Sequence, residues 1–76
     1  MKSVSICLDT IEKVRSFVNL VSRRDGDFDL VSERYVIDAK SIMGIFSLDL
    51  SKPLRLDIHN VDNYAEVVEE LKPFTV

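Results

Sequence analysis

The stretch that decides the fold spans residues 39 to 48 and reads Ala39-Lys40-Ser41-Ile42-Met43-Gly44-Ile45-Phe46-Ser47-Leu48. Apolar residues follow Ser41 at once, and a serine before a helix can accept a hydrogen bond from a free backbone N–H of the first turn. We therefore predict a short helix that is capped by Ser41. Gly44 inside it weakens a helix and indicates either close packing or a need for backbone freedom.

Before this stretch, the chain predicts a strand and then a longer helix. Val4, Ile6 and Leu8 alternate with serines and a cysteine, the period-two pattern of a strand with one buried face. Asp9 is the expected N-cap of the helix, and Glu12 suits the positive end of its dipole. One apolar stripe at helical spacing follows, made of Ile11, Val14, Phe17, Val18 and Val21.

A break and a hairpin connect that helix to the deciding stretch. Arg23 and Arg24 end the helix, and Asp25-Gly26-Asp27 interrupts the pattern. Residues 28–31 and 35–38 are two β-rich runs separated by Ser32-Glu33-Arg34, so we predict a hairpin.

After the deciding stretch, the pattern predicts one more strand and one more helix. Pro53 precedes the strand, whose inward residues are Leu54, Leu56 and Ile58. Asp62 is the expected cap of a final helix that ends before Pro73, with inward residues Tyr64, Val67, Val68 and Leu71.

The predicted order is therefore strand, helix, strand, strand, helix, strand, helix within one domain, residues 1–76. This order predicts an α+β fold in which the helices cover one face of a mostly antiparallel sheet. The other face would stay open to water, since three of the strands are apolar on one side only.

Composition excludes several functions. Ten Lys and Arg residues against 13 Asp and Glu give a net charge of −3, whereas proteins that bind nucleic acids or anionic membranes usually carry a basic surplus. No apolar run approaches the roughly 20 residues that cross a bilayer, and no signal peptide is visible, so we expect a cytoplasmic protein.

Isolated reactive residues argue against metal chemistry and enzymatic chemistry. Cys7 has no second cysteine to pair with, and His59 is the sole histidine, so neither a disulfide nor a zinc cluster is expected. We interpret Cys7 as a strand residue and His59 as a surface residue of a loop. No nucleophile and base pair or glycine-rich phosphate loop stands out, so we expect neither an enzyme nor a cofactor.

The segment from Lys40 to Gly44 resembles the Lys-Ser-Ile-Met-Gly segment of HPr, the phosphocarrier of the bacterial sugar phosphotransferase system, especially in Gram-positive bacteria. The spacing to Phe17 and to the elements at residues 54–58 and after Asp62 matches that family too. The resemblance covers nearly the whole chain. It implies the HPr-like open-faced β-sandwich, with order βαββαβα and a four-stranded antiparallel sheet.

The active-site segment departs from the family pattern. Counting from Ser41 places Thr10 at the position of the family's phosphorylated histidine, Glu12 at that of its arginine and Lys13 at that of its proline. A threonine phosphate ester lacks the transfer potential of a phosphohistidine, and the Glu12 carboxylate would repel a phosphoryl group. The resemblance therefore implies a relative without phosphocarrier activity of the family type.

Two features of the deciding stretch remain as candidates for function. In Gram-positive relatives the serine of this motif is phosphorylated by a dedicated kinase in carbon catabolite repression, so Ser41 is a candidate regulatory site, with Lys40 adding a favourable charge. The alternative for Ser41 is a helix cap alone. Ile42, Met43, Phe46 and Lys40 are candidate partner-binding residues, whereas Ile45 and Leu48 more readily fill the core.

Three hypotheses follow. The first is a regulatory module similar to the catabolite-repression homologue of HPr, with HPr kinase, a transcriptional regulator or a phosphotransferase system component as its protein partner. The second is a divergent binding protein with unrelated partners. The third is a phosphocarrier that uses another residue. The oligomeric state is left open by the sequence.

Overall fold

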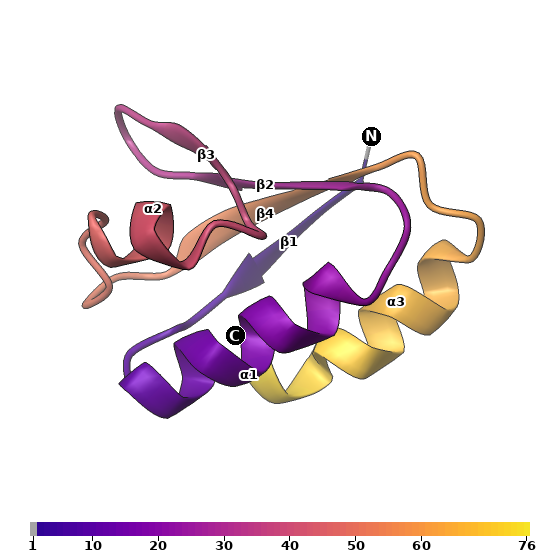
Figure 1. The fold of residues 1–76 in the computed structure, drawn as a ribbon, viewed down its shortest axis with the longest axis horizontal. Helices are drawn as coiled ribbons and strands as arrows, with labels where there is room; N and C mark the ends of the chain where they lie inside the picture. Colours follow the sequence, from indigo (N-terminus) through magenta and orange to yellow (C-terminus); the bar gives the residue numbers. More distant parts are fainter. Residues whose placement is uncertain (1) are drawn as a thin grey trace.

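A computed structural model describes residues 2–76 and places four strands and three α-helices in the predicted order (Figure 1). The elements are β1 (Lys2–Ile6), α1 (Ile11–Ser22), β2 (Asp27–Val31), β3 (Val36–Asp38), α2 (Ile42–Phe46), β4 (Leu54–His59) and α3 (Tyr64–Leu71), followed by the short 3-10 helix η1 (Lys72–Phe74).

The four strands form one antiparallel sheet in the order β1-β4-β2-β3. Leu30 of β2 lies opposite Leu56 of β4 and Ile37 of β3, which fixes the register of the central strands. In Figure 1, α1 and α3 lie side by side below the sheet, and α2 lies at one end of it. The predicted α+β open-faced sandwich is therefore confirmed.

The core lies between the sheet and the two long helices. Phe17 of α1 and Phe74 of η1 meet edge to face, with ring centroids 5.7 Å apart. Arg24, just after α1, binds Glu66 and Glu70 of α3, so ion pairs also join the end of α1 to α3. The fully buried side chains include Ile6, Leu8, Val14, Phe17, Val21, Phe28, Leu30, Ile45, Leu56, Val67 and Leu71.

The last residues of the chain lie along the edge of β1. The amide of Cys7 donates to the carbonyl of Phe74 (2.8 Å), and the amide of Val76 donates to the carbonyl of Ser5 (3.1 Å). Thr75 forms an isolated antiparallel bridge with Ile6. One end of this edge strand is therefore already paired within the chain.

Both predicted caps of the long helices were wrong by one residue. Thr10, not Asp9, has extended backbone immediately before α1, and its hydroxyl accepts a hydrogen bond from the Lys13 amide at 3.1 Å. Asn63, not Asp62, caps α3 in the same way through the Glu66 amide. In each pair, the residue directly before the first helical turn has the geometry that capping requires.

The predicted stripe of α1 also needs one correction. Val14, Phe17 and Val21 are buried as expected, but Ile11 is 61% exposed. At 3.6 residues per turn, Ile11 is rotated by roughly 90° from the centre of the three buried positions. Its side chain therefore lies on the flank of the helix.

Gly44 allows α2 to pack closely on β3. A Cβ atom at this position would lie 2.6 Å from Cγ2 of Ile37, much closer than carbon atoms can approach. The close-packing explanation for this glycine is therefore confirmed. A glycine is needed here because the neighbouring methyl group belongs to a β-branched side chain with little freedom to move.

We expect Gly44→Ala to lower the free energy of unfolding by about 1–3 kcal/mol, although alanine is the better helix former, because the added methyl overpacks the contact with Ile37. Urea denaturation measures the change. In an Ile37→Ala background, which removes Cγ2, the same substitution should cost much less. An equal cost in both backgrounds would contradict the steric explanation.

Candidate functional site

Ser41 caps α2, as predicted. Its Oγ accepts a hydrogen bond from the Gly44 amide at 3.2 Å, and its backbone is extended before the helix begins. The residue is exposed to solvent. The hydroxyl is thus accessible to another protein, and its phosphorylation stays a prediction.

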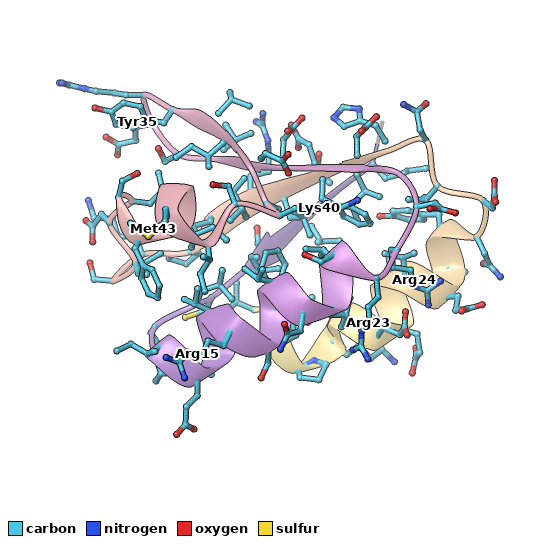
Figure 2. The ribbon with its side chains drawn as sticks, in the orientation of Figure 1. Arg15, Arg23, Arg24, Tyr35, Lys40 and Met43 are labelled. Carbon is cyan, nitrogen blue, oxygen red and sulfur yellow. The ribbon has the colours of Figure 1, made fainter. Side chains whose placement is uncertain are left out.

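Lys40 has a contact that the sequence did not indicate. Its Nζ donates to the carbonyls of Arg24 (3.0 Å) and Gly26 (3.2 Å) and lies 5.7 Å from the centre of the Phe28 ring. Figure 2 shows this side chain reaching from the turn before α2 toward the end of α1. The ammonium group is therefore already engaged by two backbone carbonyls at the end of α1, and the contribution of its charge at Ser41 stays a prediction.

The apolar residues of the deciding stretch divide between core and surface. Ile45 and Leu48 are buried, as expected. Met43 is 78% exposed, Phe46 is 43% exposed and Ile42 is partly buried. We call the exposed pair, Met43 and Phe46, the α2 patch.

Other exposed apolar side chains lie at the same end of the molecule as the α2 patch. Ile11 lies in the first turn of α1, and Tyr35 and Val36 lie at the tip of the β2–β3 hairpin. Figure 1 shows these three elements around α2, and Figure 2 places Tyr35 and Met43 at this end. Sequence reasoning missed Ile11 and Tyr35 because it assigned one to the helix core and the other to a strand.

Thr10 lies in surroundings that do not support phosphoryl transfer. Its hydroxyl is occupied as the cap of α1, and the acidic Asp9 and Glu12 stand on either side of it. Lys13 pairs with Asp9 at 2.9 Å, and this hydrogen bond lowers the pKa of Asp9 and raises that of Lys13. Lys13, three residues after Thr10, is therefore already paired with a carboxylate.

The open face of the sheet carries a row of carboxylates. Ser3, Asp57, Asp29 and Asp38 lie opposite one another on four neighbouring strands, so their side chains share one face. The Nε2 atom of His59 lies 3.5 Å from Oδ2 of Asp29, and the His59 side chain is half-buried. The sequence did not predict this row because the strand register was unknown.

Asp57 is the buried member of that row. Its carboxylate accepts a hydrogen bond from the Ser3 hydroxyl at 2.7 Å and two from Arg55, and only 6% of the residue is exposed. The Ser3 hydroxyl, assisted by Arg55, holds the pKa of this carboxyl below its usual value. The ionised form is therefore the one that the fold stabilises.

We expect Asp57→Asn to destabilise the protein at pH 7, because the carboxylate loses its charge-assisted bonds. A lowered pKa in the folded state gives stability above the unfolded pKa of about 3.9, and this stability is lost as pH falls through the folded value. The difference between the two proteins in urea denaturation should therefore shrink below about pH 4. Asp62→Asn, at an exposed position, is the control, and a constant difference would contradict the assignment.

Within residues 2–76, no group of three His, Cys, Asp or Glu side chains could hold a metal ion. In the same range, no helix is long and apolar enough to cross a membrane. Cys7 is half-buried and unpaired among the described residues.

Among solved structures, the chain is similar to the crystal structure of HPr-C-His from Thermoanaerobacter tengcongensis, with a TM-score of 0.78. The two share 26% sequence identity, and the match covers 96% of this chain and 89% of that one. No protein-family model matches, and the comparison with curated proteins gives no match. The fold is HPr-like, and this supports a relationship to the phosphocarrier family.

Proposed function

We propose that this chain, with its HPr-like fold, is a regulatory module that binds a protein partner through the α2 patch and is gated by phosphorylation of Ser41. The observation that carries the proposal is the position of an exposed serine at the start of a helix whose Met43 is 78% exposed. The partner would be HPr kinase, a transcriptional regulator or another phosphotransferase system component, in the cytoplasm.

The α2 patch has the chemistry of a protein contact. Methionine and aromatic side chains are enriched in the cores of protein interfaces, where they bury apolar surface without a charge to desolvate. The helix α2 has only five residues and packs on the rest of the protein through Ile45. The side of the helix opposite Ile45 is therefore exposed to solvent. The neighbouring Ile11 and Tyr35 could extend the same contact.

A phosphate on Ser41 would change this surface strongly. It would add a charge of about −1.5 to −2 close to the patch. It would also replace the hydroxyl that now accepts the hydrogen bond of the Gly44 amide and caps α2. Lys40 is already engaged by two backbone carbonyls at the end of α1. The phosphate oxygens would then be available to arginine or lysine side chains of the partner.

The proposed role is not enzymatic and does not include phosphate relay. Thr10 stands where the family resemblance places the phosphorylated histidine, and its hydroxyl caps α1. Glu12 at the family's arginine position adds repulsion. We therefore propose that the chain retains the binding function of the fold without its phosphocarrier function.

Incubation with a Gram-positive HPr kinase and ATP should add one phosphate, detected by intact-mass measurement, and Ser41→Ala should abolish it. The variant should still fold, because loss of an N-cap costs only about 0.5–2 kcal/mol. An HPr that is a known substrate is labelled in the same tube. An unmodified chain beside a labelled control would reject the regulatory role of Ser41.

Met43→Asp should lower kcat/KM for that phosphorylation about tenfold or more, because a charge would be buried at the docking contact. Met43→Leu should retain most of the rate. The control is Val76→Asp, which changes an equally apolar residue that is 72% exposed outside α2. A normal rate for Met43→Asp would exclude the α2 patch as the docking surface.

A further inference from the structure

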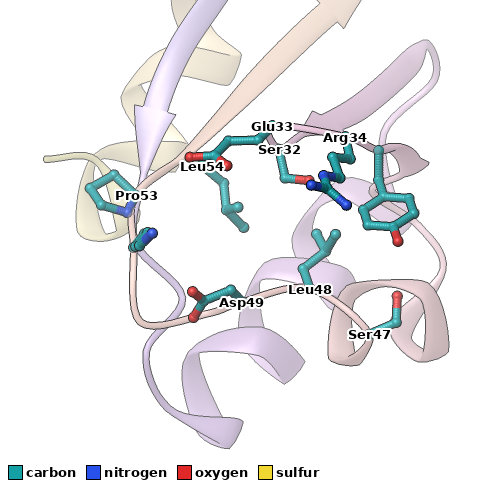
Figure 3. A pocket seen from close by; sticks show the side chains of 10 residues that line it. Ser32, Glu33, Arg34, Ser47, Leu48, Asp49, Pro53 and Leu54 are labelled. Atoms are coloured by element: carbon teal, nitrogen blue, oxygen red, sulfur yellow. The ribbon is translucent and has the colours of Figure 1, made fainter.

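A pocket of ≈ 240 Å³ lies between the tip of the β2–β3 hairpin and the loop that joins α2 to β4 (Figure 3). It includes neither Thr10 nor Ser41 nor the α2 patch. The amide of Ser32 donates to the carbonyl of Tyr35 at 2.9 Å, so the hairpin tip that forms one wall is closed as a turn. The pocket is thus formed by the fold itself.

The floor of the pocket is aliphatic. Leu48 and Leu54 are 8% and 4% exposed, and their remaining exposed surface lines the pocket. Tyr35, which is 59% exposed, lies on the hairpin side. These side chains suit a small apolar group.

Charged groups of both signs surround this floor, and Lys52 is a second cation in the lining besides Arg34. Figure 3 shows the Arg34 guanidinium on one side of the opening and the carboxylates of Glu33 and Asp49 across from it. Neither Arg34 nor Glu33 forms an ion pair with another side chain of residues 2–76. The Asp49 carboxylate is held by the Ser51 hydroxyl (2.6 Å) and amide (3.1 Å), which lower its pKa and keep it ionised.

We propose that this pocket binds a free α-amino acid with an aliphatic side chain. The ligand's carboxylate would pair with Arg34, its ammonium group with Glu33 or Asp49, and its side chain would lie on Leu48 and Leu54. A volume of ≈ 240 Å³ is below the roughly 300–1,000 Å³ of pockets for drug-sized ligands, which fits a single amino acid. The proposal goes beyond the partner-binding function and does not depend on it.

The test is an NMR titration of the ¹⁵N-labelled full chain with leucine. Amide shifts should change in residues 32–35 and 47–54 and saturate with one site. Leucinamide lacks the carboxylate and 4-methylpentanoate lacks the ammonium group, so each should bind roughly tenfold more weakly or worse. Arg34→Gln should weaken leucine binding to a similar extent but leave leucinamide binding unchanged. Arg15→Gln, at an exposed arginine of α1, is the matched control and should bind leucine normally.

Three results would overturn the proposal. One is the absence of localised shifts with leucine, isoleucine, valine and alanine at millimolar concentration. Another is equal binding of leucine by Arg34→Gln and the unchanged chain. The third is equal binding of N-acetylleucinamide, which has neither charge, since the pocket would then accept a leucine side chain from a protein. The dispersed amide spectrum of each variant reports that it is folded.

Discussion

The buried apolar side chains pack against one face of a single four-stranded sheet, and the rest of the structure depends on this arrangement. A chain of 76 residues buries only about 60% of its unfolded surface, so that one face must be fully covered. The helices α1 and α3 cover it side by side, joined by Phe17 with Phe74 and by Arg24 with two glutamates. Little of this face is left for α2, which packs at its end with one side in solvent.

The fold was largely predictable because apolar periodicity separated the strands from the helices. The Ser41 cap could also be predicted, since it depends on residues close in sequence. For Gly44 the sequence left close packing and backbone freedom open, and the contact with Ile37 of β3 decided between them. The cap of α1 was misplaced because Asp9 and Thr10 are both good caps, and only the backbone distinguishes them. In the first turn of α1, periodicity alone could not distinguish a residue on the flank of the buried stripe from one at its centre. Ile11 was therefore assigned to the core.

The candidate site was less predictable, because its contacts join residues far apart in the sequence. The ammonium group of Lys40 binds carbonyls 14 and 16 positions earlier in the chain. Its position next to Ser41 in the sequence could not indicate these partners. The carboxylate row depends on the register of four strands, and the pocket depends on two loops meeting. The α2 patch and the pocket both lie at the end of the molecule that α2 and the hairpin tip form.

The pairing of residues 74–76 with β1 also affects how copies of this chain can associate. An open sheet edge is a template for another strand, and this sheet has two edges, β1 and β3. Residues Ser5 to Cys7 already pair with the end of the chain, whereas β3 has no strand on its outer side within residues 2–76. Residues 74–76 therefore shorten the part of the β1 edge that a second copy could pair with, and β3 is the more open of the two edges.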